Sequence, residues 1–237
     1  MTDELAAAGR TNLIRLASGD AQIDEAVFAL RPAGLWSVSP LTPQQHARLA
    51  EASVTVVDQP RDLQQAIDHE IGSMQARHLI ERGYTAIAAA VPEDLREQPF
   101  ALARERGAQD ECRAAGLELL PTIRLSLERG STPATAAMLP LRSFGVAAYN
   151  DDAALAIMAA AAYAGRDVPD DIGIIGVDNT IASGVSEPTL TTVNLDVKLS
   201  AHEIVRALLE GRQVLPADAF STVRSLASII DGRSTAR

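Results

Sequence analysis

The stretch from Gly145 to Thr192 constrains the fold of this chain more than any other part of the sequence. It contains two apolar runs, each long enough for one strand, separated by a helix rich in small residues. The first run ends in Asn150-Asp151 and the second in Asp178-Asn179. Apolar runs without polar alternation are typical of parallel strands covered on both faces. Open parallel sheets bind ligands at the carboxyl ends of their strands. The stretch therefore predicts a strand-helix-strand unit with a binding edge.

The same alternation of strand and helix runs through the rest of the chain, in two series. The first series has strands at 12–17, 35–38 and 54–58 and a helix over 43–51. The second adds strands at 86–91, 118–125 and 223–230 to the opening stretch, with helices over 73–83, 100–115 and 196–211. Residues 59–68 carry no clear element and predict a crossing between the two series. The pattern predicts an α/β protein with two doubly wound parallel sheets.

Local signals predict three further details. Ser73 is placed to cap the helix that ends at Gly83, because its hydroxyl can accept from a free backbone N–H. Asp151 is predicted to cap the helix after Asn150 rather than to bind a ligand. Residues 232–237, at the C-terminal end, are predicted to be loose.

Three polar residues, Asp58, Asn150 and Asp178, each follow an apolar strand and are candidates for binding. Asp and Asn suit hydroxyl groups because their oxygens accept hydrogen bonds and the amide also donates them. Each alone is more often a turn or cap residue, so the prediction depends on the three together. On composition, Arg104 belongs to a solvated helix face. Phe100 is a core residue, with stacking on a ligand as the second interpretation.

The sequence excludes several classes of protein. It has no G-x-S-x-G, P-loop or G-x-G-x-x-G motif, and its histidines lack zinc-protease spacing, so no catalytic residue, cofactor or metal is predicted. A net charge of -10 disfavours direct binding to a nucleic-acid backbone. No apolar run has the about 18 residues of a membrane span, and the N-terminus is not a secretory signal. The single cysteine, Cys112, fits a reducing compartment, so we expect a cytoplasmic protein.

The chain resembles the effector-binding domain of the LacI/GalR family of bacterial transcription repressors. The residues that carry the resemblance are Asn150-Asp151 with the small-residue helix, Val168–Ile172, Gly176, Asp178 and Pro188–Thr192. Residues 72–88 are similar to the family's helix and strand at the entry to its second subdomain. Residues 103–118 are similar to its helix with Arg-x-x-Gly spacing, here Arg104 and Gly107. The resemblance runs from about residue 12 to the end and is most specific over 145–192.

The resemblance implies the type I periplasmic-binding-protein-like fold, with an effector cleft between two α/β subdomains. The N-terminal subdomain would comprise 1–68 and 194–219, and the C-terminal one 69–193 and 220–237, with crossovers near 67–70, 192–195 and 219–224. The effector would be a sugar or a related metabolite. Arg104, Asn150 and Asp178 become its first expected contacts, because a buried guanidinium can hold two hydroxyls. Asp58 and Phe100 are weaker ones.

The resemblance also implies a homodimer that binds operator DNA through an N-terminal helix-turn-helix head. The chain contains neither that head nor the first strand of the N-terminal subdomain, so we expect no DNA binding by these 237 residues. The leading hypothesis is a ligand-sensing domain in which the effector shifts the population of subdomain orientations. A solute-binding protein of a transport system is the alternative and would require export. An enzyme on this scaffold is the third hypothesis, and no catalytic constellation supports it.

Overall fold

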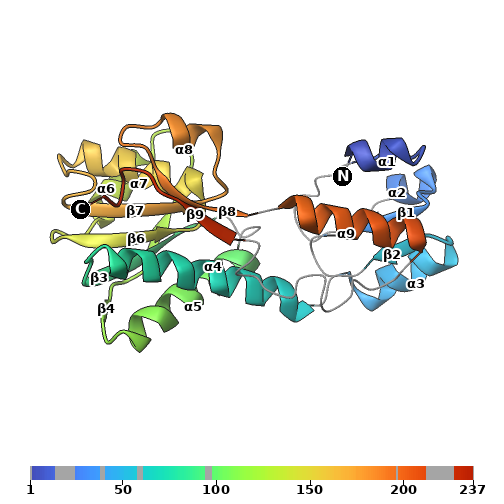
Figure 1. The fold of residues 1–237 in the computed structure, drawn as a ribbon, viewed down its shortest axis with the longest axis horizontal. Coiled ribbons are helices and arrows are strands. Elements are labelled where there is room, and N and C mark those ends of the chain that lie inside the picture. The colour runs from blue at the N-terminus through green and yellow to red at the C-terminus, as the bar shows by residue number, and fades with distance from the viewer. Residues whose placement is uncertain are drawn as a thin grey trace. The chain divides into compact units, whose positions relative to one another are not determined.

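The computed structural model describes residues 2–13, 25–37, 41–57, 61–93, 98–195, 197–211 and 227–236. The chain folds as two compact units (Figure 1). The smaller unit comprises Met1–Gln64 and Asp196–Thr222, and the larger comprises Gln65–Leu195 and Val223–Arg237. Both contain parallel strands and helices, which confirms the predicted α/β class. Among the described residues, no helix has the length and apolar character needed to cross a membrane.

The smaller unit is built on a parallel pair of short strands. Its elements are α1 (Thr2–Ala7), α2 (Glu25–Leu30), β1 (Gly34–Trp36), α3 (Pro43–Glu51), β2 (Thr55–Val57) and α9 (Val197–Glu210). Helix α3 begins where the sequence predicts, because Thr42 and Gln45 form a reciprocal capping box. Leu49 and Val56 are buried in this unit, with Phe28 packed against them. The predicted strand at 12–17 lies almost entirely outside the described residues.

The larger unit is organised around a seven-stranded sheet. Its elements are α4 (Arg61–Glu81), β3 (Ala86–Pro92), α5 (Gln98–Ala114), β4 (Glu118–Leu119), β5 (Ile123–Leu125), α6 (Thr132–Met138), β6 (Phe144–Ala148), α7 (Asp151–Tyr163), β7 (Ile172–Val177), α8 (Ile181–Val185), β8 (Thr191–Leu195) and β9 (Ala227–Ile230). The strand order is β4-β3-β6-β7-β8-β9, and β5 also pairs with β3. Strand β9 is antiparallel to β8, and the other pairs are parallel.

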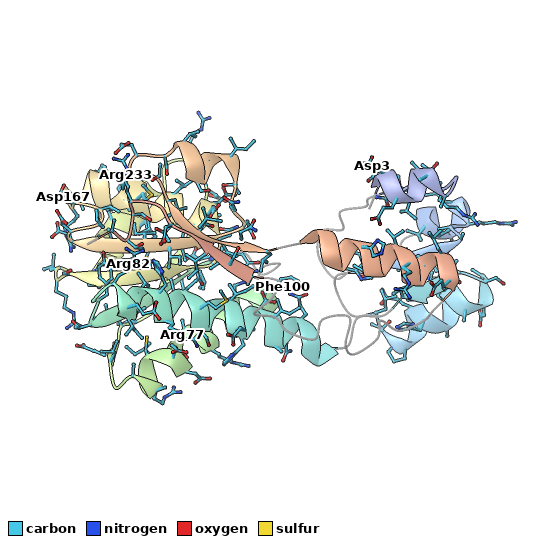
Figure 2. All side chains as sticks on the ribbon, in the orientation of Figure 1. Asp3, Arg77, Arg82, Phe100, Asp167 and Arg233 are labelled. Carbon is cyan, nitrogen blue, oxygen red and sulfur yellow. The ribbon has the colours of Figure 1, made fainter. Side chains whose placement is uncertain are left out.

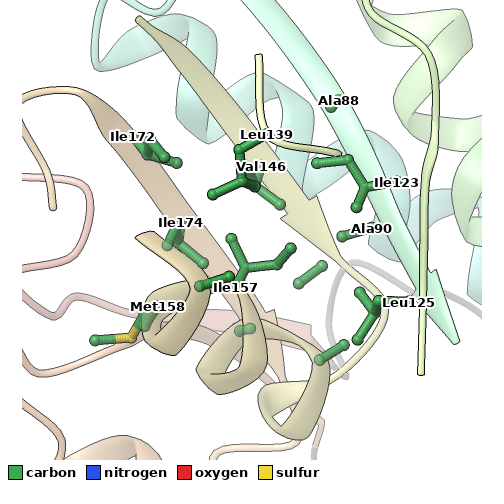
Figure 3. Close-up of a cluster of buried hydrophobic side chains, with 14 of the residues drawn as sticks. Ala88, Ala90, Ile123, Leu125, Leu139, Val146, Ile157, Met158, Ile172 and Ile174 are labelled. Atoms are coloured by element: carbon green, nitrogen blue, oxygen red, sulfur yellow. The ribbon is translucent and has the colours of Figure 1, made fainter. Parts of the chain in front are cut away.

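Both faces of the larger sheet are buried, as the continuous apolar runs predict. Val146 and Ile174 pack with Ile157 of α7 in one cluster (Figure 3). Their chain neighbours Ala147 and Ile175 point the other way, into a second cluster that contains residues of α4 and α5. Helices α4 and α5 therefore cover one face of the sheet, and α6 and α7 cover the other (Figure 1). This two-sided cover holds the strand ends that carry the candidate site.

Helix α4 corrects two predictions. It begins at Arg61, so the prediction that residues 59–68 carry no clear element is wrong from that residue onward, although the boundary between the two units does fall there, between Gln64 and Gln65. Its first turns are polar, but Arg, Gln and Ala are good helix formers, and polarity alone does not indicate a loop. Ser73 is not a cap, because it lies in the interior of α4. Its hydroxyl donates to the carbonyl oxygen of Gly107 in α5, at 3.1 Å.

The prediction of a loose C-terminal end is also wrong. Ser234 and Thr235 are both fully buried. The Ser234 hydroxyl donates to the Ile174 carbonyl oxygen at 2.5 Å and accepts from the Thr191 N–H at 2.8 Å. The Thr235 hydroxyl lies 2.9 Å from that of Thr191 and 2.9 Å from Nε2 of His78. Short hydroxyl side chains can thus fix a terminal segment without apolar residues, because they form hydrogen bonds with backbone groups that have no partner within the sheet.

His78 is the buried end of this chain of hydrogen bonds. Desolvation by burial, and then the charge of Arg82, lower the pKa of His78 below its ordinary value. The imidazole is therefore neutral at neutral pH and able to share a hydrogen bond with Thr235. Arg82, labelled in Figure 2, donates to the carboxylate of Asp231 at 2.7 Å, in the same unit.

Candidate functional site

The candidate site is built on the carboxyl ends of β6 and β7. These strands are parallel neighbours in register from Phe144 with Ile172 to Ala147 with Ile175. Asn150 follows the end of β6, and Asp178 follows the end of β7. Since parallel neighbours end at the same edge of a sheet, the structure brings these two predicted residues to one edge of the larger unit.

Asn150, which is predicted to contact the effector, has a structural role in this fold. It is the N-cap of α7, and its side-chain oxygen accepts from the Ala153 N–H at 2.9 Å. The prediction that Asp151 makes this cap is therefore wrong. The cap orients the Asn150 side chain at the start of the helix and engages its carbonyl oxygen.

Asp151 instead lies at the centre of a buried network that the sequence interpretation missed. Its carboxylate accepts from the Thr180 N–H at 2.7 Å, the Thr180 hydroxyl at 3.0 Å and the Thr192 hydroxyl at 2.6 Å. Gly176 makes room for it, since an added Cβ there would overlap the Asp151 carboxylate oxygen and lie 3.2 Å from its Cα. The network ties the starts of α7 and α8 to β8. The signal for it was the glycine in β7 together with the paired threonines that begin β8.

Asp178 and Asn179 have a strained backbone. Their φ angles are 102° and 48°, in the region that side chains with a Cβ rarely adopt. Two hydrogen bonds hold this conformation, from the Asp178 N–H to the Val193 carbonyl oxygen at 2.9 Å and from the Asn179 N–H to the Thr192 hydroxyl at 3.2 Å. The Asp178 residue is exposed. Strain of this kind persists where the surrounding structure imposes it, and such positions cluster at functional sites.

Arg104 reaches this edge from α5. Its Nε donates to the Asp68 carboxylate at 2.8 Å, and its Nη1 donates to the Tyr149 carbonyl oxygen at 2.5 Å. The guanidinium carbon lies 4.7 Å from the centre of the Tyr149 ring, which is cation–π distance. The side chain is only 12% exposed, so its assignment to a solvated face is wrong. Because Tyr149 directly precedes Asn150, Arg104 is held against the end of β6.

Two glycines explain how Arg104 comes so close to the sheet. An added Cβ at Gly72 of α4 would lie 2.7 Å from the Arg104 carbonyl carbon, and one at Gly107 of α5 would lie 2.7 Å from that of His69. The two helices therefore cross backbone against backbone. The Arg-x-x-Gly spacing thus combines a ligand candidate with the contact that positions its helix.

The other two candidates, Phe100 and Asp58, add less support to the candidate site. Phe100, labelled in Figure 2, is partly buried and packs against the main core of the larger unit, which is its first interpretation. Asp58 lies outside the described residues. An open hollow of about 350 Å³ lies between the loop of residues 127–132 and the side of α7 that carries Asp152 and Leu155, and none of the four described candidates lines it.

A family model described as a periplasmic binding protein-like domain matches residues 76–235. The chain belongs to this family. The matched residues of this periplasmic binding protein-like chain include Arg104, Asn150, Asp151 and Asp178.

Curated relatives refine the assignment. The chain is 33% identical over 143 residues to the HTH-type transcriptional regulator DegA of Bacillus subtilis, covering 59% of this chain and 42% of that protein. It is 32% identical over 154 residues to the HTH-type transcriptional regulator GalR of Escherichia coli, covering 62% and 45%. The chain thus spans about half the length of the curated relatives it matches. These relatives are regulators rather than enzymes.

Solved structures show the same fold at lower identity. A LacI family transcriptional regulator from Enterococcus faecium with bound ribose has a TM-score of 0.76 at 19% identity, over 99% of this chain and 90% of that one. The transcriptional repressor ascG of Escherichia coli has a TM-score of 0.71 at 19% identity, over 98% and 90%. Together with the family match, these structures confirm the predicted periplasmic-binding-protein-like fold, and the curated relatives confirm the resemblance to regulators of the LacI/GalR type.

Proposed function

We propose that this periplasmic binding protein-like chain is the effector-sensing part of a LacI-type transcriptional regulator. The observation that carries the proposal is the grouping of Arg104, Asn150 and the strained Asp178 at one sheet edge. A guanidinium, an amide and a carboxylate together offer the donors and acceptors that the hydroxyl groups of a sugar require. The ribose held by the Enterococcus faecium structure supports a sugar as the effector class.

The remaining roles follow from this proposal. Asp58 and Phe100 are secondary contacts, and Phe100 would stack the face of its ring on a sugar. The effector shifts the population of two conformations of the regulator, and it can do so only through a difference in affinity for the two. A net charge of -10 makes this chain a poor ligand for a phosphate backbone, so DNA is contacted through another segment. Such a regulator works in the cytoplasm.

Two other functions are less well supported. A transport protein shares the fold, but the relatives matched here are named transcriptional regulators, which favours regulation. An enzyme would need a nucleophile or an acid–base pair at the strand ends. Arg104 is ion-paired, Asn150 caps a helix and Asp151 accepts internal hydrogen bonds, which is not the arrangement of a nucleophile and its base.

The proposal predicts that a sugar binds and that the edge residues decide its affinity. Isothermal titration of the chain with D-ribose, D-glucose and D-galactose should reveal binding of at least one. Arg104→Lys and Asp178→Asn should each weaken that binding at least about tenfold, because lysine lacks the planar fork that holds two hydroxyls and asparagine lacks the negative charge. Arg106→Ala, at an exposed position on the same helix, is the control and should change affinity less than about twofold. Equal affinities in all three variants would exclude this site.

We also propose that two copies of the chain associate, and that α8 contributes to the interface. Ile181 and Val185 are 88% and 78% exposed and lie four residues apart, on one face of the helix. Large apolar groups exposed side by side favour burial against a partner. The resemblance to the LacI/GalR family supports a second copy of this chain as that partner.

Ile181→Glu should dissociate the dimer, because it places a charge in a contact that would be apolar. We expect at least about a tenfold weaker dimer by analytical ultracentrifugation. Leu141→Glu is the matched control, since Leu141 is 99% exposed in the loop before β6. Equal dissociation by the two changes, or a wild-type chain that stays monomeric at high micromolar concentration, would contradict this interface.

A further inference from the structure

Gln75 of α4 is a buried amide whose hydrogen bonds reach both strands of the candidate site. It is 1% exposed. Its Nε2 lies 2.8 Å from the carbonyl oxygen of Ala148, 3.1 Å from that of Ile175 and 3.2 Å from that of Gly176. Three oxygens around one end of the side chain identify that end as the nitrogen, because only an N–H can donate to them.

The contacts lie where β6 and β7 part. Their mutual register ends at Ala147 with Ile175. Beyond that point β6 stays paired with β3, where the Tyr149 N–H donates to the Ala90 carbonyl oxygen at 2.8 Å, while β7 stays paired with β8 to Val177. The carbonyl groups at the parting are buried among apolar residues. A buried carbonyl without a donor is costly, so the Gln75 amide replaces bonds that the strand ladder no longer supplies.

We propose that Gln75 is a positioning residue that holds the two strand ends, and with them Asn150 and Asp178, at a fixed separation. Ala148 stands two residues before Asn150, and Gly176 stands two residues before Asp178. One rigid amide thus fixes the spacing of the two groups. The inference rests on the proposed function in that these groups are taken as the effector contacts. The physical claim about the strand ends can be tested without any effector.

Gln75→Met is the informative change, because methionine has a similar length and volume but donates no hydrogen bond. Leu79→Val is its matched control. Leu79 lies one turn further along α4, is fully buried beside Gly145 near the start of β6, and loses one methylene away from the carboxyl ends of the strands. Both variants should lower stability moderately, so stability alone does not distinguish a positioning role from a packing role.

The first arm measures amide hydrogen exchange by NMR on the full chain without ligand. In Gln75→Met, the amides of Tyr149 and Asp178 should exchange at least about tenfold faster relative to those of Phe144 and Ile172, at the opposite ends of the same strands. In Leu79→Val, which acts near the start of β6, the amides of Tyr149 and Asp178 should not accelerate more than those of Phe144 and Ile172. The same pattern in both variants would overturn the proposal.

The second arm measures D-ribose affinity by titration calorimetry in the wild type and both variants. Gln75→Met should bind D-ribose at least about tenfold more weakly, and Leu79→Val within about twofold of wild type. Unchanged affinity in Gln75→Met would overturn the positioning role even if exchange is local. If the wild type does not bind D-ribose, the choice of sugar fails, and the exchange ratio alone decides whether Gln75 holds the strand ends.

Discussion

Gly107→Ala is expected to lower the free energy of unfolding of the larger unit by about 3 kcal/mol or more. An added Cβ would overlap the His69 carbonyl oxygen, lie 2.7 Å from its carbon and lie 3.0 Å from the Ser73 nitrogen. All three atoms belong to the backbone of α4, so no change of rotamer relieves the overlap. The helices must separate, which would also strain the contacts of Arg104 with Asp68 and Tyr149.

Gly107→Ala is expected to destabilise rather than stabilise the unit because of the overlap between the added Cβ and the backbone of α4. Alanine is preferred to glycine within a helix by about 1 kcal/mol, so the change alone would stabilise α5. Gly184→Ala provides the matched control, because Gly184 is also helical and has no atom within 4 Å of an added Cβ. It should be neutral or stabilising by up to about 1 kcal/mol.

Urea unfolding followed by circular dichroism measures both variants. The single tryptophan, Trp36, belongs to the smaller unit, and its fluorescence serves as an internal reference. We expect Gly107→Ala to lower the dichroism midpoint and to lower the thermal midpoint by roughly 6–12 °C, with little change at Trp36. If Gly107→Ala is as stable as Gly184→Ala, the close crossing of α4 and α5 is not present in solution.

The sequence predicts the fold of the larger unit well because its strands carry their own signal. The runs that end at Ala148 and Val177 are apolar at every position, which occurs where both faces of a sheet are covered. The predicted strand at 118–125 is less accurate, since it forms two short strands, β4 and β5. Ser73 shows the limit of local signals. A serine before an apolar helical pattern resembles a cap, but its hydroxyl bonds to Gly107, 34 residues away.

The candidate site depends on contacts that local patterns do not encode. Only the family resemblance selected Arg104, because its partners Asp68 and Tyr149 are 36 and 45 residues distant. Gln75 was missed, because a polar residue in a predicted helix carries no signal of its own. Its role becomes visible only when the fold brings the ends of two strands within hydrogen-bond distance of it. Asp151 was assigned to the local cap that Asn150 makes. The sequence therefore predicts where each strand ends, but it does not predict the side chains that hold those ends in position relative to one another.

Asp151→Ala is expected to destabilise the larger unit by about 3 kcal/mol. The change removes a fully buried carboxylate that accepts three hydrogen bonds from Thr180 and Thr192. The threonine hydroxyls can rotate toward other acceptors, but the Thr180 N–H is fixed by the backbone and would be left without its acceptor. The free-energy cost of that unpaired N–H is larger than the gain from no longer burying a charge. Removing one partner of a buried network costs more than the whole network contributes to stability.

Asp152→Ala separates this network from the general effect of a negative charge at a helix start. Both aspartates lie in the first turn of α7, and both interact favourably with the helix dipole, but Asp152 is exposed. Urea unfolding should show a loss of about 0.5 kcal/mol for Asp152→Ala. Thr192→Val, which removes one donor, should add less to Asp151→Ala than it costs alone, because the two share a hydrogen bond. Additive losses would mean that Asp151 stabilises the unit by its charge at the helix start and not by joining α7, α8 and β8.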